Sequence, residues 1–213
     1  NREDIRRTGK AGTAEIPGTG RRSPSPPGED MYGIRRILRE KYGTMTEELQ
    51  FIPFTSPADR GWAEAMEIYR RSFPYKEQRS EEDHVRALRD PHFRADGIWC
   101  GDEFVGILYH WQGDGWHYVE HLAVSPALRG RNMGSKALAA FCEGRRVILE
   151  IDPPADEISI RRLHFYRRLG FVENPHEYIH PSFRRPFEQH RLVLMSYPSP
   201  LTDDEARRFA DFV

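Results

Sequence analysis

The sequence predicts an α/β protein with a mixed, mostly antiparallel central sheet of six to seven strands, flanked by helices on both faces. Two observations predict this class. Several segments repeat apolar residues at the spacing of one helical face, whereas others are short, apolar and bounded by turn residues. These segments follow one another in the order β-α-α-β-β-β-α-β-α-β-β, which indicates a mixed sheet covered on both sides.

The first part of the pattern is a strand at residues 49–54 followed by two helices. The first helix is predicted by four apolar residues at i, i+4, i+7 and i+11: Trp62, Met66, Tyr69 and Phe73. Pro74 ends it, because proline cannot continue a helix. Ser80 is then an N-cap, followed by acidic residues, and it opens a second helix that runs to about Arg89.

The remaining elements begin with a hairpin, because the strands at residues 97–101 and 104–112 are separated by a two-residue turn. The next strand covers residues 116–124. One of its faces carries Tyr118, Glu120, Leu122 and Val124, and His121 lies on the other face as a packed or solvent-facing histidine. The later elements are a helix at 134–143, a strand at 147–151, a helix at 158–169, a strand beginning at 171–172, a strand at 191–197 and a helix at 203–212.

The chain length and composition suit one folded domain with additional terminal segments. Residues 1–30 are rich in glycine, proline, serine and arginine, so we expect a disordered leader. Residues 31–46 are expected to form a short helix or a linker. The folded domain covers residues 47–200, and residues 201–213 form a C-terminal helix.

Composition argues against several classes of function. Thirty-two basic residues face 33 acidic ones, so no nucleic acid or membrane partner is expected and any basic site must be local. Cys100 and Cys142 lie in apolar contexts, which predicts buried thiols without a disulfide in a cytoplasmic protein. No apolar run is long enough to cross a membrane, and the histidines lack metal-ligand spacing, so no metal is expected.

The most informative motif is Arg129-Gly130-Arg131-Asn132-Met133-Gly134, which follows a strand and opens a helix. A glycine-rich turn at a helix N-terminus directs backbone N–H groups outward and suits a pyrophosphate. Two other phosphate-binding turns are excluded. The interval from Gly130 to Gly134 and the order Ser135-Lys136 do not match a Walker loop, and the Gly-x-Gly-x-x-Gly fingerprint of a dinucleotide fold is absent.

This motif resembles the cofactor signature of the GNAT N-acetyltransferases, Arg/Gln-x-x-Gly-x-Gly/Ala, and is preceded by the family-like Leu122-Ala123-Val124-Ser125-Pro126. A second block, Phe165–Phe171, resembles the family's Tyr-x-x-x-Gly-Phe helix end. The sequence departs from the family at Asn132, where glycine is usual, and at Ser159, where asparagine is common. Because asparagine tolerates a left-handed backbone, we expect the turn to be kept.

The resemblance covers residues 47–197 and implies a splay between the fourth and fifth strands, where the acyl-CoA arm lies. It also implies two catalytic residues. Glu120 is the general base, and Tyr166 is the acid that protonates the leaving thiolate. The alternative for Glu120 is a structural carboxylate paired with an arginine or with a strand edge, and the alternative for Tyr166 is a core aromatic. The implied cofactor-binding residues are Leu122, Ala123, Val124, Arg129, Gly130, Arg131, Asn132, Met133, Gly134, Ser135 and Ser159.

The function implied is transfer of an acetyl or short acyl group from acetyl-CoA to a primary amine by direct attack, by a monomer or a homodimer. The acceptor is a small molecule or a protein. The alternative is a catalytically weak acyl-CoA-binding regulatory module, motivated by Asn132 and Ser159. Two aromatic loops, 73–79 and 174–186, are candidates for the acceptor pocket. Their proposed substrate-binding residues are Phe73, Tyr75, Glu77, Tyr178 and His180.

Overall fold

A computed structural model describes residues 48–176, 178–180 and 190–213 of this chain. The chain divides into two units, Asn1–Thr46 and Glu47–Val213. The first unit contains the expected leader and the expected helix or linker, and both expectations lie outside the described residues. The second unit is the domain described below.

The domain contains strands and helices close to the predicted ones. The strands are β1 (Leu49–Pro53), β2 (Phe93–Cys100), β3 (Glu103–Gln112), β4 (His117–Val124), β5 (Val147–Ile151), β6 (Val172–Glu173), β7 (Tyr178–His180) and β8 (His190–Tyr197). The helices are α2 (Trp62–Ser72), α3 (Glu81–Ala87), α4 (Met133–Cys142), α5 (Glu157–Arg168) and α6 (Asp203–Phe212), with 3-10 turns η1 (Tyr75–Glu77) and η2 (Pro126–Leu128).

The sheet confirms the predicted fold class. Its order is β1-β2-β3-β4-β5-β8-β6, and β7 pairs with β8. β4 and β5 run parallel, whereas the other pairs are antiparallel. The sequence pattern does not predict β7, whose residues belong to the second aromatic loop. Such a three-residue strand is too short for a visible alternation, and it exists because β8 offers a partner.

β2 also begins earlier than predicted. The sequence pattern predicts this strand at residues 97–101, but β2 starts at Phe93. The first half contains Arg94 and Asp96, and these polar residues hide the strand pattern. Asp96 is nevertheless buried, and its carboxylate lies 3.3 Å from Nε2 of His110 on the neighbouring strand. Pairing with β3 therefore extends the strand beyond what local propensity indicates.

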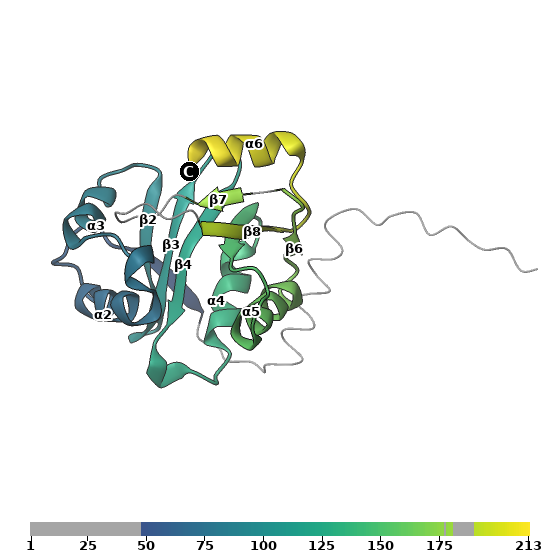
Figure 1. The fold of residues 1–213 in the computed structure, drawn as a ribbon. Helices are drawn as coiled ribbons and strands as arrows, with labels where there is room; N and C mark the ends of the chain where they lie inside the picture. The colour runs from purple at the N-terminus through teal and green to yellow at the C-terminus, as the bar shows by residue number, and fades with distance from the viewer. Residues whose placement is uncertain (1–47, 177, 181–189) are drawn as a thin grey trace, which may run out of the picture. The chain divides into compact units, whose positions relative to one another are not determined.

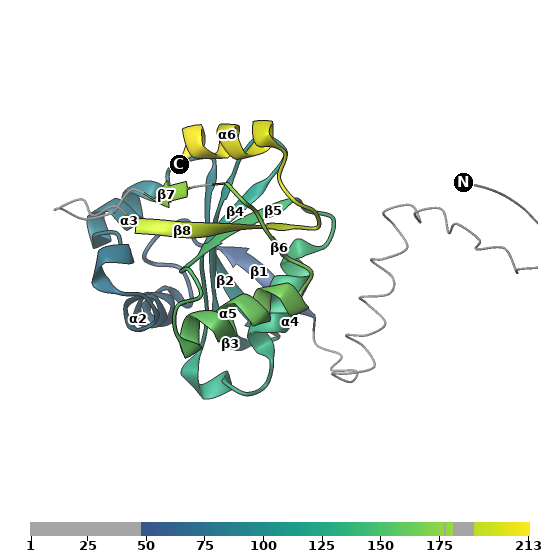
Figure 2. The ribbon, with the colours of Figure 1, turned by 45° about the vertical axis from the view of Figure 1, so that its right-hand side comes forward.

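Helices cover both faces of the sheet, as predicted (Figures 1 and 2). α4 and α5 pack on one face, where Leu138, Phe141 and Leu163 join the largest cluster of buried apolar residues. α2 packs on the other face through a second cluster that includes Met66 and Tyr69. α6 covers the same face further along, where a third cluster joins its side chains to those of β4, β5 and β8.

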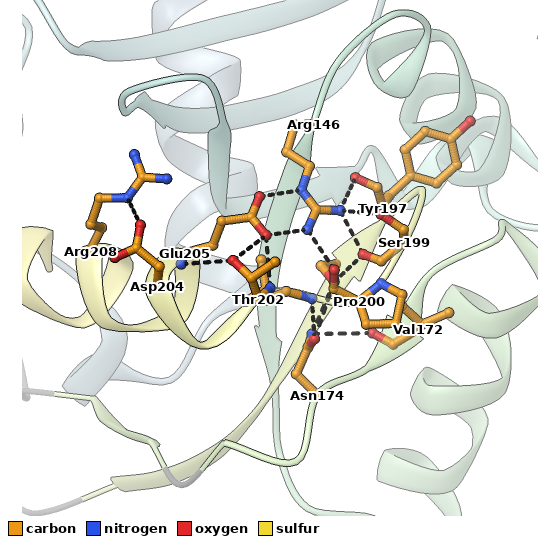
Figure 3. Close-up of polar contacts among 12 residues, drawn as sticks. Arg146, Val172, Asn174, Tyr197, Ser199, Pro200, Thr202, Asp204, Glu205 and Arg208 are labelled. Atoms are coloured by element: carbon orange, nitrogen blue, oxygen red, sulfur yellow. Dashed lines mark hydrogen bonds and ion pairs between the residues drawn. The ribbon is translucent and has the colours of Figure 1, made fainter. Parts of the chain in front are cut away.

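Arg146, just before β5, attaches the segment between β8 and α6 to the sheet (Figure 3). Its guanidinium donates hydrogen bonds to the carbonyl oxygens of Tyr197, Ser199 and Pro200, at 3.4, 2.6 and 2.9 Å. It also contacts both carboxylate oxygens of Glu205, each at 3.1 Å. Glu205 in turn caps α6 through Thr202. Arg146 thus adds polar contacts at the start of α6 to the apolar packing of that helix.

Candidate active site

β4 and β5 separate partway along their length, which confirms the predicted splay. Their parallel pairing consists of three residue pairs and ends at Val119 and Leu149. β4 continues beside β3 as far as Val124, which is paired with Gly106. From Glu120 onward, the edge of β4 that faces β5 therefore has no β5 partner. We call this opening between the two strands the V.

A β-bulge lies at the start of the V. On β3, Tyr109 is paired with His121 and the next residue, His110, with Val119, so Glu120 is an extra residue in β4. The bulge reverses the alternation of side chains. Predicting Leu122 and Val124 on the face of Tyr118 was therefore wrong, because Leu122 and Val124 pack with α4 and α5. Tyr118 faces α6 instead.

His121 lies opposite Leu122 and Val124, as predicted, but the bulge places it on the face of Tyr118 and turns it toward α2. Its ring packs edge-on against Tyr69 and Phe73, with centroid distances of 4.9 and 4.5 Å. Nε2 lies 3.1 Å from the backbone carbonyl oxygen of Glu77, so this nitrogen carries the hydrogen. Nδ1 is 3.4 Å from Oε2 of Glu120. The expectation of a packed histidine is confirmed, since only 3% of its side chain is exposed.

Glu120 forms a buried, two-point ion pair with Arg79. The guanidinium donates to the two carboxylate oxygens at 2.6 and 2.7 Å, and the side chains of Arg79 and Glu120 are 9% and 5% exposed. Burial alone would raise the pKa of Glu120, but Arg79 and His121 together hold it far below its usual range. Such a carboxylate is a weak base. The geometry shows the alternative arrangement, in which Glu120 is a structural carboxylate paired with an arginine. Proton acceptance by Glu120 stays a prediction.

Arg79 is a site residue that the sequence did not single out. Its backbone N–H donates to the Tyr69 hydroxyl at 3.0 Å. Its guanidinium lies over the rings of Phe93 and Trp111, 5.1 and 5.6 Å from their centroids. These contacts fix Arg79 against β2 and β3 while it holds Glu120. The sequence feature that could have indicated a role for Arg79 is its position in the aromatic loop 73–79.

The same loop brings two predicted substrate-binding residues next to the bulge. Phe73 is half-buried against His121, and Glu77 contributes the carbonyl oxygen that His121 contacts. Tyr75 is 69% exposed. Tyr178 and His180 form part of β7, but their side chains lie outside the described residues. Acceptor binding by these five residues stays a prediction.

The predicted anion turn is present at the head of α4. Gly130 and Asn132 both adopt a left-handed backbone, with φ of 82° and 56°. The expectation that Asn132 keeps the turn is therefore confirmed. Asn132 is the N-cap of α4, yet its side chain makes no capping hydrogen bond. The first-turn N–H groups of α4 are thus left for another acceptor.

Charge and space at this turn also suit an anion. Arg129 and Arg131 are exposed, and Met133 is the buried anchor that begins the helix. A Cβ added at Gly130 would meet no atom within 4 Å, whereas one at Gly134 would lie 3.5 Å from Val124 and 4.0 Å from Phe165. Gly134 therefore lies close to both the end of β4 and α5. The surface beside Gly130 is open.

The structure does not support a cofactor contact by Ser159. Its hydroxyl accepts hydrogen bonds from the N–H groups of Ala155 and Asp156, both at 3.0 Å, and lies 2.9 Å from the Asp156 carboxylate. One donor and two acceptors are all that a hydroxyl has. The hydrogen-bonding capacity of the Ser159 hydroxyl is consequently filled within the capping box of α5.

Tyr166 lies on α5, half-buried against the cluster beneath α4 and α5. Its ring packs edge-on against Phe171, with centroids 5.7 Å apart. Burial raises the pKa of Tyr166, and Arg162 lowers it by less. The phenol therefore keeps its proton at neutral pH, which is the state that an acid requires. Its catalytic role stays a prediction.

Other predicted features can be compared directly. Cys100 and Cys142 are both buried, as expected. No group of three or more histidine, cysteine, aspartate or glutamate side chains suited to a metal occurs in the part of the chain that the structure describes. Within that same part, no helix has both the length and the apolar character of a membrane span.

Comparison with known proteins identifies the family. The profile of the Acetyltransferase (GNAT) family matches residues 62–171. A GNAT family protein from Bacteroides thetaiotaomicron is 30% identical, with a TM-score of 0.70 over 75% of this chain and 94% of that chain. An acetyltransferase from Thermus thermophilus shares the fold at 21% identity, with a TM-score of 0.50 over 71% and 97% of the two chains. No curated protein matches significantly. The chain belongs to the GNAT family of acetyltransferases.

Proposed function

We propose that this protein transfers an acetyl or short acyl group from acetyl-CoA to a primary amine, by direct attack within a ternary complex. The observation that carries the proposal is the opening of the V beside an uncapped helix N-terminus. An extended pantetheine arm can pair with the unpaired edge of β4 as an added strand would. The pyrophosphate would then meet the N–H groups at the head of α4.

The proposed reaction is a direct acyl transfer. The amine nitrogen forms a bond to the thioester carbonyl carbon and loses a proton to a base, after which the carbon–sulfur bond breaks and its electron pair goes to sulfur. Tyr166, which keeps its proton at neutral pH, can protonate that thiolate. The phenolate regains a proton through water from the protonated base. The net reaction gives an amide and a free thiol.

The proposal predicts amine-dependent release of free thiol from acetyl-CoA. The assay mixes the protein with acetyl-CoA and a thiol-reactive dye. Three acceptors sample different amines: 1,4-diaminobutane, β-alanine and a peptide with a free N-terminal alanine. We expect at least one amine to raise the rate of thiol release about 100-fold or more above the rate without amine.

A binding module without catalysis is a second candidate, and the Arg79–Glu120 pair favours it because that pair leaves Glu120 a weak base. Calorimetry of acetyl-CoA binding, combined with the thiol-release assay, separates the two functions. Binding of acetyl-CoA with no acceleration by any amine supports the module and contradicts the enzyme. Absence of both binding and turnover contradicts both.

A further inference from the structure

Asp96, His110 and His117 form a row across three neighbouring strands. His110 on β3 is paired with Arg94 of β2 and with Val119 of β4. Asp96 and His117 each lie two residues from those partners, so the three side chains are diagonal neighbours on one face of the sheet. Asp96 and His110 are 6% and 4% exposed, and His117 is half-buried. The row therefore leads from the interior toward the surface.

The two imidazole rings turn the same nitrogen toward each other. Nδ1 of His110 lies 3.5 Å from Nδ1 of His117. This separation is longer than the about 2.7–3.2 Å that is usual for an N–H hydrogen bond. Two nitrogens bound to one tetrahedral Zn²⁺ at roughly 2.0–2.1 Å lie about 3.3–3.4 Å apart. The pair thus has nearly the spacing of two ligands of one metal ion.

Asp96 determines which nitrogen of His110 can bind a metal. Its Oδ2 lies 3.3 Å from Nε2 of His110. A carboxylate at this distance favours the tautomer with hydrogen on Nε2, so Nδ1 presents its lone pair toward His117. Metal-binding histidines commonly have a carboxylate behind the other ring nitrogen, where it fixes the ring and raises its basicity. The row therefore offers two ligands and one orienting group.

The surroundings of the pair suit a cation. Burial, followed by His110 and Arg145, lowers the pKa of His117 to about 4, so its ring is neutral at pH 7, as metal binding requires. Phe141 in the last turn of α4 packs against the two rings, with centroid distances of 4.8 and 5.7 Å. The C-terminal end of a helix favours positive charge. Arg145 opposes a cation, and the carboxylate of Asp96 offsets that charge.

We propose that His110 and His117 bind one divalent transition-metal ion, of the class of Zn²⁺ or Cu²⁺, and that Asp96 positions His110. Imidazole nitrogens suit these ions. Among the described residues no third side-chain ligand joins the pair, so water completes the coordination at the half-buried ring of His117.

This site departs from the expectation that the chain binds no metal. That expectation rested on spacing along the sequence, whereas strand pairing brings the two histidines together. The site is also separate from the V, because His117 begins β4 and the V opens beyond Val119. It therefore does not depend on the proposed acetyl transfer.

The test is a calorimetric titration of Zn²⁺ into the protein without a histidine tag. His117→Gln removes one ligand at a half-buried position and should weaken binding about 100-fold or more. Asp96→Asn removes the orienting carboxylate and should weaken it about 10–100-fold. His164→Gln is the matched control, because His164 is an exposed histidine on α5, and it should bind as the wild type does.

Cu²⁺ supplies a spectroscopic readout. Electron paramagnetic resonance of the wild type with one equivalent of Cu²⁺ should show coupling to two imidazole nitrogens, and His117→Gln should lose one of them. A wild type that binds no Zn²⁺, or equal affinities in the wild type and His117→Gln, would overturn the inference and leave the proposed function intact. If His117→Gln does not fold, an unchanged affinity in Asp96→Asn overturns it.

Discussion

Replacement of Arg79 by methionine is expected to lower the free energy of unfolding at pH 7 by about 3–5 kcal/mol. Arg79 and Glu120 are both almost fully buried and contact each other at two points. Removal of the cation leaves an uncompensated carboxylate inside the domain, and desolvation of that charge exceeds what His121 alone restores. Urea unfolding followed by circular dichroism measures the difference. Arg86→Met, which breaks an exposed pair with Asp83, is the control and should change stability by less than about 0.5 kcal/mol.

The effect of Arg79→Met should depend on pH in a known direction. In the wild type, Arg79 holds the pKa of Glu120 below its usual value of 4.5, so the pair stabilises the fold above that value and loses its contribution as the pH falls. In the variant, burial raises the pKa of Glu120 instead, so its penalty disappears once the carboxyl is protonated. The difference between the two proteins should therefore shrink as the pH falls toward about 4.5 and shrink further below that value. A difference that is constant from about pH 4 to pH 8 would contradict this account of the pair.

Replacement of Arg146 by methionine should cost about 2–3 kcal/mol, because charged hydrogen bonds to several carbonyl groups and to Glu205 are lost at once. The side chain is 15% exposed and its partner 22%, so solvent screens the pair in part. We expect lower stability to urea and easier proteolysis between β8 and α6. Arg208→Met is the control, since Arg208 makes exposed pairs with Asp114 and Asp204. Equal stability of the two variants would show that Arg146 does not anchor α6.

Local patterns predicted those parts of the site that depend on local physics. The turn could be predicted because Gly130 tolerates a positive φ and asparagine is the side chain best suited to follow it at Asn132. The helical face of Trp62, Met66 and Tyr69 was visible because a buried helix face repeats regularly. These features need no knowledge of which strands are neighbours.

The rest of the site depends on pairing between distant segments. The bulge at Glu120 is a property of the register between β3 and β4, so a regular alternation rule misplaces His121 and Leu122. Arg79 and Glu120 are 41 residues apart, and nothing local connects them.

The most direct test of the account is a calorimetric titration of acetyl-CoA into two glycine variants. Gly130 and Gly144 both have positive φ, 82° and 68°, and an added Cβ would meet no atom within 4 Å at either. Gly130→Val and Gly144→Val therefore impose similar backbone strain, at the head and just beyond the end of α4. If the head of α4 binds the pyrophosphate, Gly130→Val should weaken binding about tenfold or more, and Gly144→Val should bind as the wild type does. Equal dissociation constants for the two variants would contradict the central claim.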